Sequence, residues 1–230
     1  LIVAGGTGGH IFPGLAVAEE LKKNGIRLSW IGTSRGMENK VVKSADITLM
    51  ISSFKGVRGK GFLSIFSLPW RLLLAVLEML RVLKKIKPDL VACFGGYITV
   101  PVGVSSTILR IPIFIHEQNA IMGTANRLLS KLAKKIFLSF KATKHAPISA
   151  KFVGNPLRNS FISITPPEAR WSQKTGPLRV LILGGSLGAS ALNREIPKIF
   201  ARLVEEKVTN FSIVHQSGCK DQFNVDSYYK

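Results

Sequence analysis

The chain opens with Leu1-Ile2-Val3-Ala4-Gly5-Gly6-Thr7-Gly8-Gly9-His10, and this stretch decides the fold. Four apolar residues in a row are typical of a strand that is buried on both faces of a sheet. The glycines that follow favour a tight turn, and residues 12–24 have the apolar spacing of a helix. We therefore expect a βαβ unit at the start. Because the first residue is not Met, we interpret the opening as a trimmed strand rather than a targeting segment.

The same alternation continues along the chain. Ile113-Phe114-Ile115 is another continuously apolar strand, so the sheet is expected to be parallel and covered on both faces. The right-handed crossover rule then predicts a doubly wound α/β sheet. Further strands are predicted at 27–33, 47–51, 89–94, 113–116 and 135–140, and helices at 37–44, 63–86 (with a break near Pro69), 100–109 and 122–134.

The pattern breaks in the proline-rich stretch 155–177 and then restarts. A strand at 178–183, a glycine loop, a helix at 189–206 and a strand at 211–215 repeat the opening weakly. We predict a first domain at 1–158, a linker at 159–177 and the start of a second doubly wound domain at 178–230. Two strands and one helix cannot cover both faces of a sheet. The second domain is therefore expected to be incomplete.

Composition narrows the class of protein. The net charge of +19 indicates an anionic partner, either nucleic acid, a phosphate-rich substrate or an anionic membrane surface. Only 8% of the residues are aromatic and no nucleic-acid motif is present, so we expect no nucleic-acid partner. Cys93 and Cys219 are far apart, which argues against a disulfide framework or a thiolate zinc site and fits a reducing cytoplasm. No helix that spans a membrane is expected.

Three glycine loops follow predicted strands: 5–9 before His10, Gly95-Gly96-Tyr97, and 184–189 around Ser186. Ligands of open α/β sheets bind at the carboxyl ends of the strands, where glycine lets the backbone approach a phosphate and a helix start offers free N–H groups. The loops therefore suit diphosphate groups on more than one ligand. For each loop, the alternative is a tight turn without a ligand.

Two familiar nucleotide motifs do not fit. A P-loop needs Gly-Lys-Ser/Thr at its end, whereas Gly9 is followed by His10-Ile11. A dinucleotide fingerprint needs a third glycine, where Ile11 stands, and a carboxylate at the end of the second strand, where Thr33-Ser34 stand. We expect no cofactor and no metal.

Three of the four histidines follow predicted strands. His10 could act as a base at neutral pH, and the alternative is a hydrogen bond at the helix start. His116-Glu117-Gln118-Asn119 directly follows an apolar strand, and such polar residues must face water, a ligand or one another. His145 is expected to be solvated and His215 to be a strand-end residue.

An ordered set of motifs resembles the MurG family of glycosyltransferases, glycosyltransferase family 28. The motifs are Gly5–His10 with 12–18, Gly95-Gly96-Tyr97, His116–Asn119, Gly154-Asn155-Pro156-Leu157-Arg158, Gly184–Ala189 with Asn193, and His215-Gln216-Ser217-Gly218. The order and spacing hold from Leu1 to about Gly218, and the set is far more specific than any one motif.

The resemblance implies a GT-B type fold with two Rossmann-like domains. It also implies an inverting transfer of N-acetylglucosamine from UDP-N-acetylglucosamine to the muramyl 4-hydroxyl of lipid I, giving lipid II for peptidoglycan. Contacts to UDP-N-acetylglucosamine are implied for Thr7, Gly8, Gly9, Asn119, Arg158, Ser186 and Asn193. Catalytic positions are implied at His10, Glu117, His116 and Tyr97, and acceptor-diphosphate positions at Gly95, Gly96 and Asn126.

For the chemistry, we favour His10 as the base that takes the proton of the attacking hydroxyl. The sequence has no Asp-x-Asp, so backbone N–H groups and the helix dipole at Ser186 are the expected stabilisers of the leaving diphosphate, with Arg158 adding charge. The family's donor site continues past Lys230 with a ribose-binding Glu and a sugar-binding Gln. We therefore expect the C-terminal third to be absent and this fragment alone to be inactive.

The segment 62–87 is predicted to dock on an anionic membrane. Apolar residues among basic ones are typical of peripheral attachment, and the alternative is a core helix with a solvated basic end. The expected membrane residues are Phe62, Ile65, Phe66, Trp70 and Arg71. We expect a peripheral protein on the cytoplasmic face of the bacterial membrane, with cell-wall synthesis proteins as further partners. The alternatives are another GT-B transferase with a different lipid acceptor and a non-catalytic membrane-binding remnant.

Overall fold

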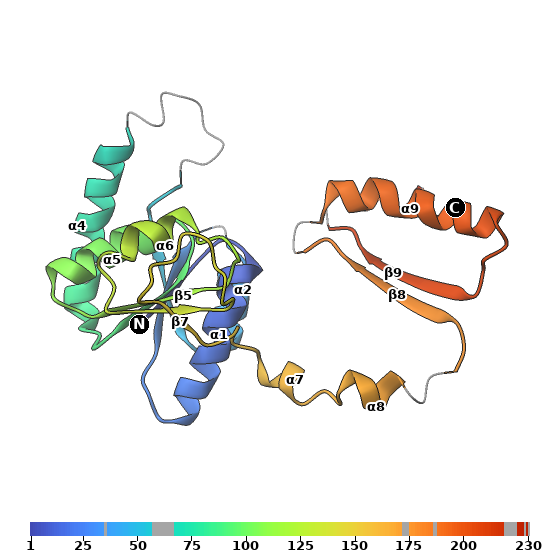
Figure 1. Ribbon diagram of the computed structural model, residues 1–230. Coiled ribbons are helices and arrows are strands. Elements are labelled where there is room, and N and C mark those ends of the chain that lie inside the picture. The colour runs from blue at the N-terminus through green and yellow to red at the C-terminus, as the bar shows by residue number, and fades with distance from the viewer. Residues whose placement is uncertain are drawn as a thin grey trace. The chain divides into compact units, whose positions relative to one another are not determined.

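The computed structural model describes residues 1–34, 36–56, 67–171, 175–185, 188–218, 225–227 and 229. The chain divides into two compact units, Leu1–Ser163 and Ile164–Lys230, and each is described by itself (Figure 1).

The first unit is built on a seven-stranded sheet in the order β3-β2-β1-β4-β5-β6-β7. Every neighbouring pair is parallel, which confirms the predicted doubly wound sheet. The order reverses between β1 and β4, and in such sheets ligands bind at the carboxyl ends of the strands beside this switch point. The strands are β1 (Ile2–Ala4), β2 (Ser29–Thr33), β3 (Thr48–Ser52), β4 (Val91–Gly95), β5 (Ile113–Glu117), β6 (Lys135–Leu138) and β7 (Lys151–Phe152).

Helices cover both faces of this sheet, because successive strand residues point to opposite sides. Ile2 and Trp30 pack with α1 and α2, whereas Val3 and Ile31 pack in a second cluster with α4, α5 and α6. The continuously apolar strands thus supply two cores rather than one. The helices of the unit are α1 (Gly8–Lys23), α2 (Glu38–Ser44), α4 (Leu68–Ile86), α5 (Thr99–Ile108), α6 (Thr124–Leu129) and α7 (Asn159–Ile162).

Several predicted boundaries were wrong. α1 begins at Gly8, four residues before the predicted start, and α6 ends at Leu129 rather than at residue 134. The helix α4 is not broken at Pro69, because this proline lies in its first turn, where a missing N–H costs nothing. The short edge strand β7 was not predicted. The predicted linker also contains secondary structure, since α7 and α8 (Pro167–Trp171) form within it.

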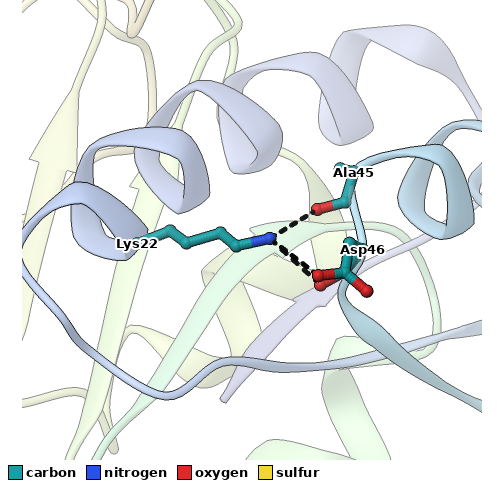
Figure 2. A network of polar contacts seen from close by, with 3 residues as sticks. All are labelled: Lys22, Ala45 and Asp46. Carbon is teal, nitrogen blue, oxygen red and sulfur yellow. Dashed lines mark hydrogen bonds and ion pairs between the residues drawn. The ribbon is translucent and has the colours of Figure 1, made fainter.

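Lys22, in the last turn of α1, contacts the residues that follow α2. Figure 2 shows Lys22 Nζ donating to the carbonyls of Ala45 (3.3 Å) and Asp46 (3.4 Å) and to the Asp46 carboxylate (3.1 Å). Because both side chains are exposed, the ion pair itself contributes little. The Ala45 carbonyl, at the C-cap of α2, is one of those that the end of a helix leaves without partners.

The second unit contains the parallel strands β8 (Leu178–Leu183) and β9 (Phe211–Gln216) with the helix α9 (Ser190–Glu205). The rings of Phe200 and Phe211 pack with centroids 4.9 Å apart, which fixes α9 to this sheet. Leu181, Leu183 and Val214 are exposed. The described strands therefore pack against α9 with one face of the sheet, and the opposite face is exposed.

Candidate active site

Loops from three neighbouring strands meet at the switch point of the first unit. A β-carbon on Gly96 would lie 2.6 Å from the Gly5 carbonyl oxygen, and one on Gly95 would lie 2.6 Å from His10 Nδ1. Both glycines also have positive φ, +115° at Gly95 and +89° at Gly96. Only glycine allows this approach, so the second glycine loop is shaped by contact with the first.

His10 is held at the centre of these loops by a main-chain carbonyl. Its Nδ1 lies 3.1 Å from the carbonyl oxygen of Phe94, and Nε2 of Gln118 donates to the same oxygen at 2.9 Å and also contacts Nδ1. A carbonyl can only accept, so a bond between Nδ1 and Phe94 places the proton on Nδ1 and leaves the lone pair on Nε2. With this tautomer the Gln118 amide donates to the Phe94 carbonyl and not to Nδ1. This is the tautomer that a base acting through Nε2 needs.

The environment of His10 favours its neutral form. Burial lowers the pKa of His10, and the Glu117 carboxylate and the Phe94 carbonyl oppose this only in part. An imidazole with a lowered pKa carries a free lone pair at neutral pH, as general-base chemistry requires.

Glu117 is an anchor for the loop that follows β5. It is fully buried, and its two oxygens accept four hydrogen bonds, from the main chain and side chain of Asn119 (3.0 and 2.8 Å), from Gly123 N (2.9 Å) and from Asn126 Nδ2 (2.9 Å). A carboxylate saturated in this way stabilises a loop rather than moving a proton. Asn126 is itself buried, and its role toward an acceptor diphosphate stays a prediction.

His116 is buried beside the same loop and joins it to the end of the sheet. Its Nε2 lies 3.2 Å from the carbonyl oxygen of Gly154, and its ring packs against Phe94 with centroids 5.6 Å apart. Burial lowers the pKa of His116, although the Gly154 carbonyl acts in the opposite direction. His116 thus contacts both the segment after β7 and the end of β4, as a residue that positions these segments would.

The first glycine loop presents the start of α1. Thr7 precedes the helix with extended backbone, and in this described loop its hydroxyl makes no capping bond to α1. Thr7 and Gly9 are exposed. The N–H groups of a first helical turn have no intrahelical partners and carry a positive dipole end, so this loop suits an anionic group.

Arg158 reaches this loop from the segment after β7. Its guanidinium lies over the ring of Phe12, 4.4 Å from the centroid, and 5.0 Å from that of Phe161. Phe12 in turn packs on Gly8, where a β-carbon would lie 2.9 Å from the ring. The structure thus places the Arg158 cation beside the first turns of α1.

Tyr97 lies at the rim of the site. It is partly exposed, and its ring packs edge-on against Phe54, with centroids 5.9 Å apart. An exposed aromatic side chain thus directly follows the second glycine loop.

The second unit holds the third glycine loop. Ser186 lies outside the described residues. Asn193, on α9, is buried and donates from Nδ2 to the Ser217 carbonyl at 2.8 Å. A β-carbon on Gly188 would lie 2.0 Å from the same carbonyl oxygen, so the loop packs tightly on the end of β9. His215 is a strand-end residue, as predicted.

The helix α4 carries the described part of the predicted membrane surface. Phe62, Ile65 and Phe66 lie outside the described residues, Trp70 is 64% exposed, and Arg71 donates to the Lys55 carbonyl. Sequence reasoning missed that Leu73, Leu74 and Leu77 are exposed on the same helix. Their spacing from Trp70 of three, four and seven residues is the signal that could have found them. In the described part of the chain, no helix has the length and apolar character to cross a membrane.

Two other contributors were not predicted, Gln118 against His10 and the buried Glu38 beside the first glycine loop. Among the described residues, no group of three or more His, Cys, Asp or Glu side chains could hold a metal ion.

Comparisons with known proteins agree with this geometry. Residues 1–138 match the N-terminal domain of glycosyltransferase family 28, and residues 179–230 match its C-terminal domain. The chain is 43% identical over 220 residues to a protein of Burkholderia pseudomallei (strain 1106a) named UDP-N-acetylglucosamine--N-acetylmuramyl-(pentapeptide) pyrophosphoryl-undecaprenol N-acetylglucosamine transferase, with 96% of this chain and 59% of that protein covered. A protein of Paraburkholderia phymatum with the same name is 44% identical, with 96% and 58% covered.

Solved structures give the same result. The crystal structure of Acinetobacter baumannii MurG has a TM-score of 0.76 and 37% identity, over 99% of this chain and 62% of that one. A UDP-GlcNAc 2-epimerase from Neisseria meningitidis shares the fold alone, with a TM-score of 0.57 and 15% identity over 99% of this chain and 67% of that one. The chain spans about three fifths of the curated relatives (59% and 58%). The predicted GT-B fold is confirmed, and the chain belongs to glycosyltransferase family 28.

Proposed function

We propose that this chain is part of an inverting transferase that moves N-acetylglucosamine from UDP-N-acetylglucosamine to the muramyl 4-hydroxyl of lipid I. The observation that carries the proposal is the set of glycine loops around His10, in a chain whose relatives are named for this transfer. UDP-N-acetylglucosamine and lipid I are the proposed substrates.

His10 is the proposed base. Nδ1–H is held by the Phe94 carbonyl, so Nε2 takes the proton of the attacking hydroxyl as the new glycosidic bond forms and the bond to UDP breaks. Gln118 and the loop anchored by Glu117 keep the imidazole in place. Tyr97 and His116 are proposed to shape the site around the acceptor.

Binding of anionic groups is assigned to the loops. Thr7, Gly8 and Gly9, in and before the first turn of α1, are proposed to contact the donor, as are Arg158, whose guanidinium lies over Phe12, and Asn119. Gly95 and Gly96, together with Asn126, are proposed to serve the acceptor diphosphate. In the second unit, Ser186 and Asn193 are proposed donor contacts.

Attachment to the cytoplasmic face of the bacterial membrane is proposed through α4. Trp70, Leu73, Leu74 and Leu77 expose apolar surface on a helix whose last turn carries Lys84 and Lys85. Apolar side chains that enter the acyl boundary and lysines that meet anionic headgroups together suit a peripheral protein that must reach a lipid-linked acceptor.

The test is transfer of labelled N-acetylglucosamine by the full-length protein to lipid I in mixed micelles, with product identified by mass spectrometry. Formation of lipid II is expected. Transfer only to a different lipid acceptor would favour another transferase of this fold, and vesicle binding without any transfer would favour a non-catalytic role.

A further inference from the structure

A buried carboxylate joins the first glycine loop to the end of β2. Glu38, in the first turn of α2, is fully buried. Its Oε1 accepts hydrogen bonds from the main chain of Thr33 (2.6 Å) and from the Thr33 hydroxyl (2.7 Å), and its Oε2 accepts from Gly6 N at 3.4 Å. One side chain thus connects segments that are 5 and 32 residues away in sequence.

Three glycines pack against the Glu38 side chain so closely that none of them could carry a β-carbon without a shift of the structure. A β-carbon on Gly32 would lie 2.6 Å from Glu38 Cγ, one on Gly36 would lie 1.8 Å from Oε2, and one on Gly5 would lie 3.0 Å from Oε1. Three glycines from three segments therefore surround one side chain. A buried carboxylate is costly unless it is hydrogen-bonded, so the donors at Thr33 and Gly6 hold it in one place.

We propose that Glu38 is the positioning residue of the first glycine loop. Its bond to Gly6 N fixes a residue with φ +97°, and the next three residues are Thr7, Gly8 and Gly9 at the start of α1. The conformation of Gly6 sets the direction in which these N–H groups point. The inference rests on the proposed function, which assigns this loop to the sugar-nucleotide donor; Glu38 itself, fully buried, acts through the loop and touches no substrate.

The test compares Glu38→Gln with Thr33→Val and with the exposed control Glu20→Gln in the full-length protein. Gln has the same shape but turns an acceptor into a donor that opposes the Thr33 or Gly6 N–H, and a charge-assisted bond is about twice as strong as a neutral one. We expect Glu38→Gln to raise KM for UDP-N-acetylglucosamine about 10-fold, which corresponds to about 1.4 kcal/mol, with KM for lipid I unchanged. Thr33→Val keeps the Gly6 bond and should have a smaller effect.

Hydrogen exchange gives a readout that does not depend on activity. Without ligand, Glu38→Gln should speed exchange of the 5–9 segment at least several-fold and leave the 178–185 segment unchanged. Unchanged KM and unchanged exchange in a less stable variant would overturn the proposal and leave Glu38 as a purely structural residue. If Glu38→Gln does not fold, Glu38→Asp decides by the same two measurements, because the shorter side chain cannot reach both the Thr33 and the Gly6 N–H groups. If the wild-type protein transfers no N-acetylglucosamine, the proposed function fails, whereas the exchange result still decides whether Glu38 positions the loop.

Discussion

His10 and Phe94 are joined by a bond from the imidazole Nδ1 to a main-chain carbonyl oxygen, 3.1 Å long, across 84 residues of sequence. A main-chain acceptor cannot be removed by a side-chain substitution, so the orientation of the ring depends on the backbone of β4. His10 itself is therefore the informative residue to change.

Replacing His10 by Ala should lower turnover by about 10²–10⁴-fold, the usual contribution of a positioned base, and should change the affinity for UDP-N-acetylglucosamine much less. Steady-state kinetics and calorimetric titration on the full-length protein measure the two effects. His145→Asn is the matched control, because His145 is exposed and its φ of 65° suits asparagine. Turnover within a few-fold of wild type would leave His10 as a structural residue at the helix start.

The pH profile should place the base below the ordinary histidine range. Burial lowers the pKa of His10 from 6.5, so the base becomes active as pH rises through a value below 6.5. We expect kcat/KM to rise with pH on its acidic limb, with the midpoint of this limb below 6.5. An acidic limb centred above 6.5 would contradict the neutral, buried imidazole. Gln118→Glu provides a second check, since a carboxylate beside Nδ1 should shift this limb to higher pH.

Glu117→Gln should destabilise the first unit. The amide puts an N–H group against donors from Asn126 or Asn119 and Gly123, and unsatisfied buried groups cost about 1–3 kcal/mol each. Urea unfolding followed by circular dichroism should show a lower midpoint. Glu20→Gln, at an exposed ion pair, should stay within about 0.5 kcal/mol of wild type. Equal midpoints for the two variants would mean that the Glu117 network adds no stability.

Membrane attachment should depend on the apolar surface of α4. The double variant Trp70→Ser and Leu74→Ser removes two exposed apolar side chains without touching the buried face of the helix. Co-sedimentation with anionic vesicles should fall about 10-fold or more, since each fully buried apolar side chain contributes roughly 1.5–3 kcal/mol. Ile148→Ser with Val153→Ser, which changes exposed apolar residues outside α4, should bind like wild type. Undiminished sedimentation of the α4 variant would place the attachment elsewhere.

The sequence predicts the regular parts of this fold well because short apolar segments alternate with helical stretches along most of the first unit. The β7 strand, Lys151–Phe152, has no such segment and exists only because the edge of β6 accepts it. The start of α1 was placed too late, since glycines carry no apolar periodicity even when the chain around them is helical.

The residues of the candidate site also divide into those that the sequence predicts and those that it does not. His10 and the glycine loops could be found from their position after strands, and the resemblance to a known family supplied their expected roles. Glu38 could not be found in this way, because its partners lie on other segments of the chain. Gln118 was noticed only as part of a polar cluster, since the carbonyl that it shares with His10 belongs to the backbone of β4.

The strand order has a consequence for synthesis on the ribosome. Of these strands β1 is made first and lies inside the sheet, β2 and β3 extend the sheet on one side, and β4 to β7 extend it in sequence on the other. Each new strand therefore joins an edge that is already present, and none has to insert between two strands that have paired. The first unit can assemble in the order in which it emerges, before residues 164–230 are translated.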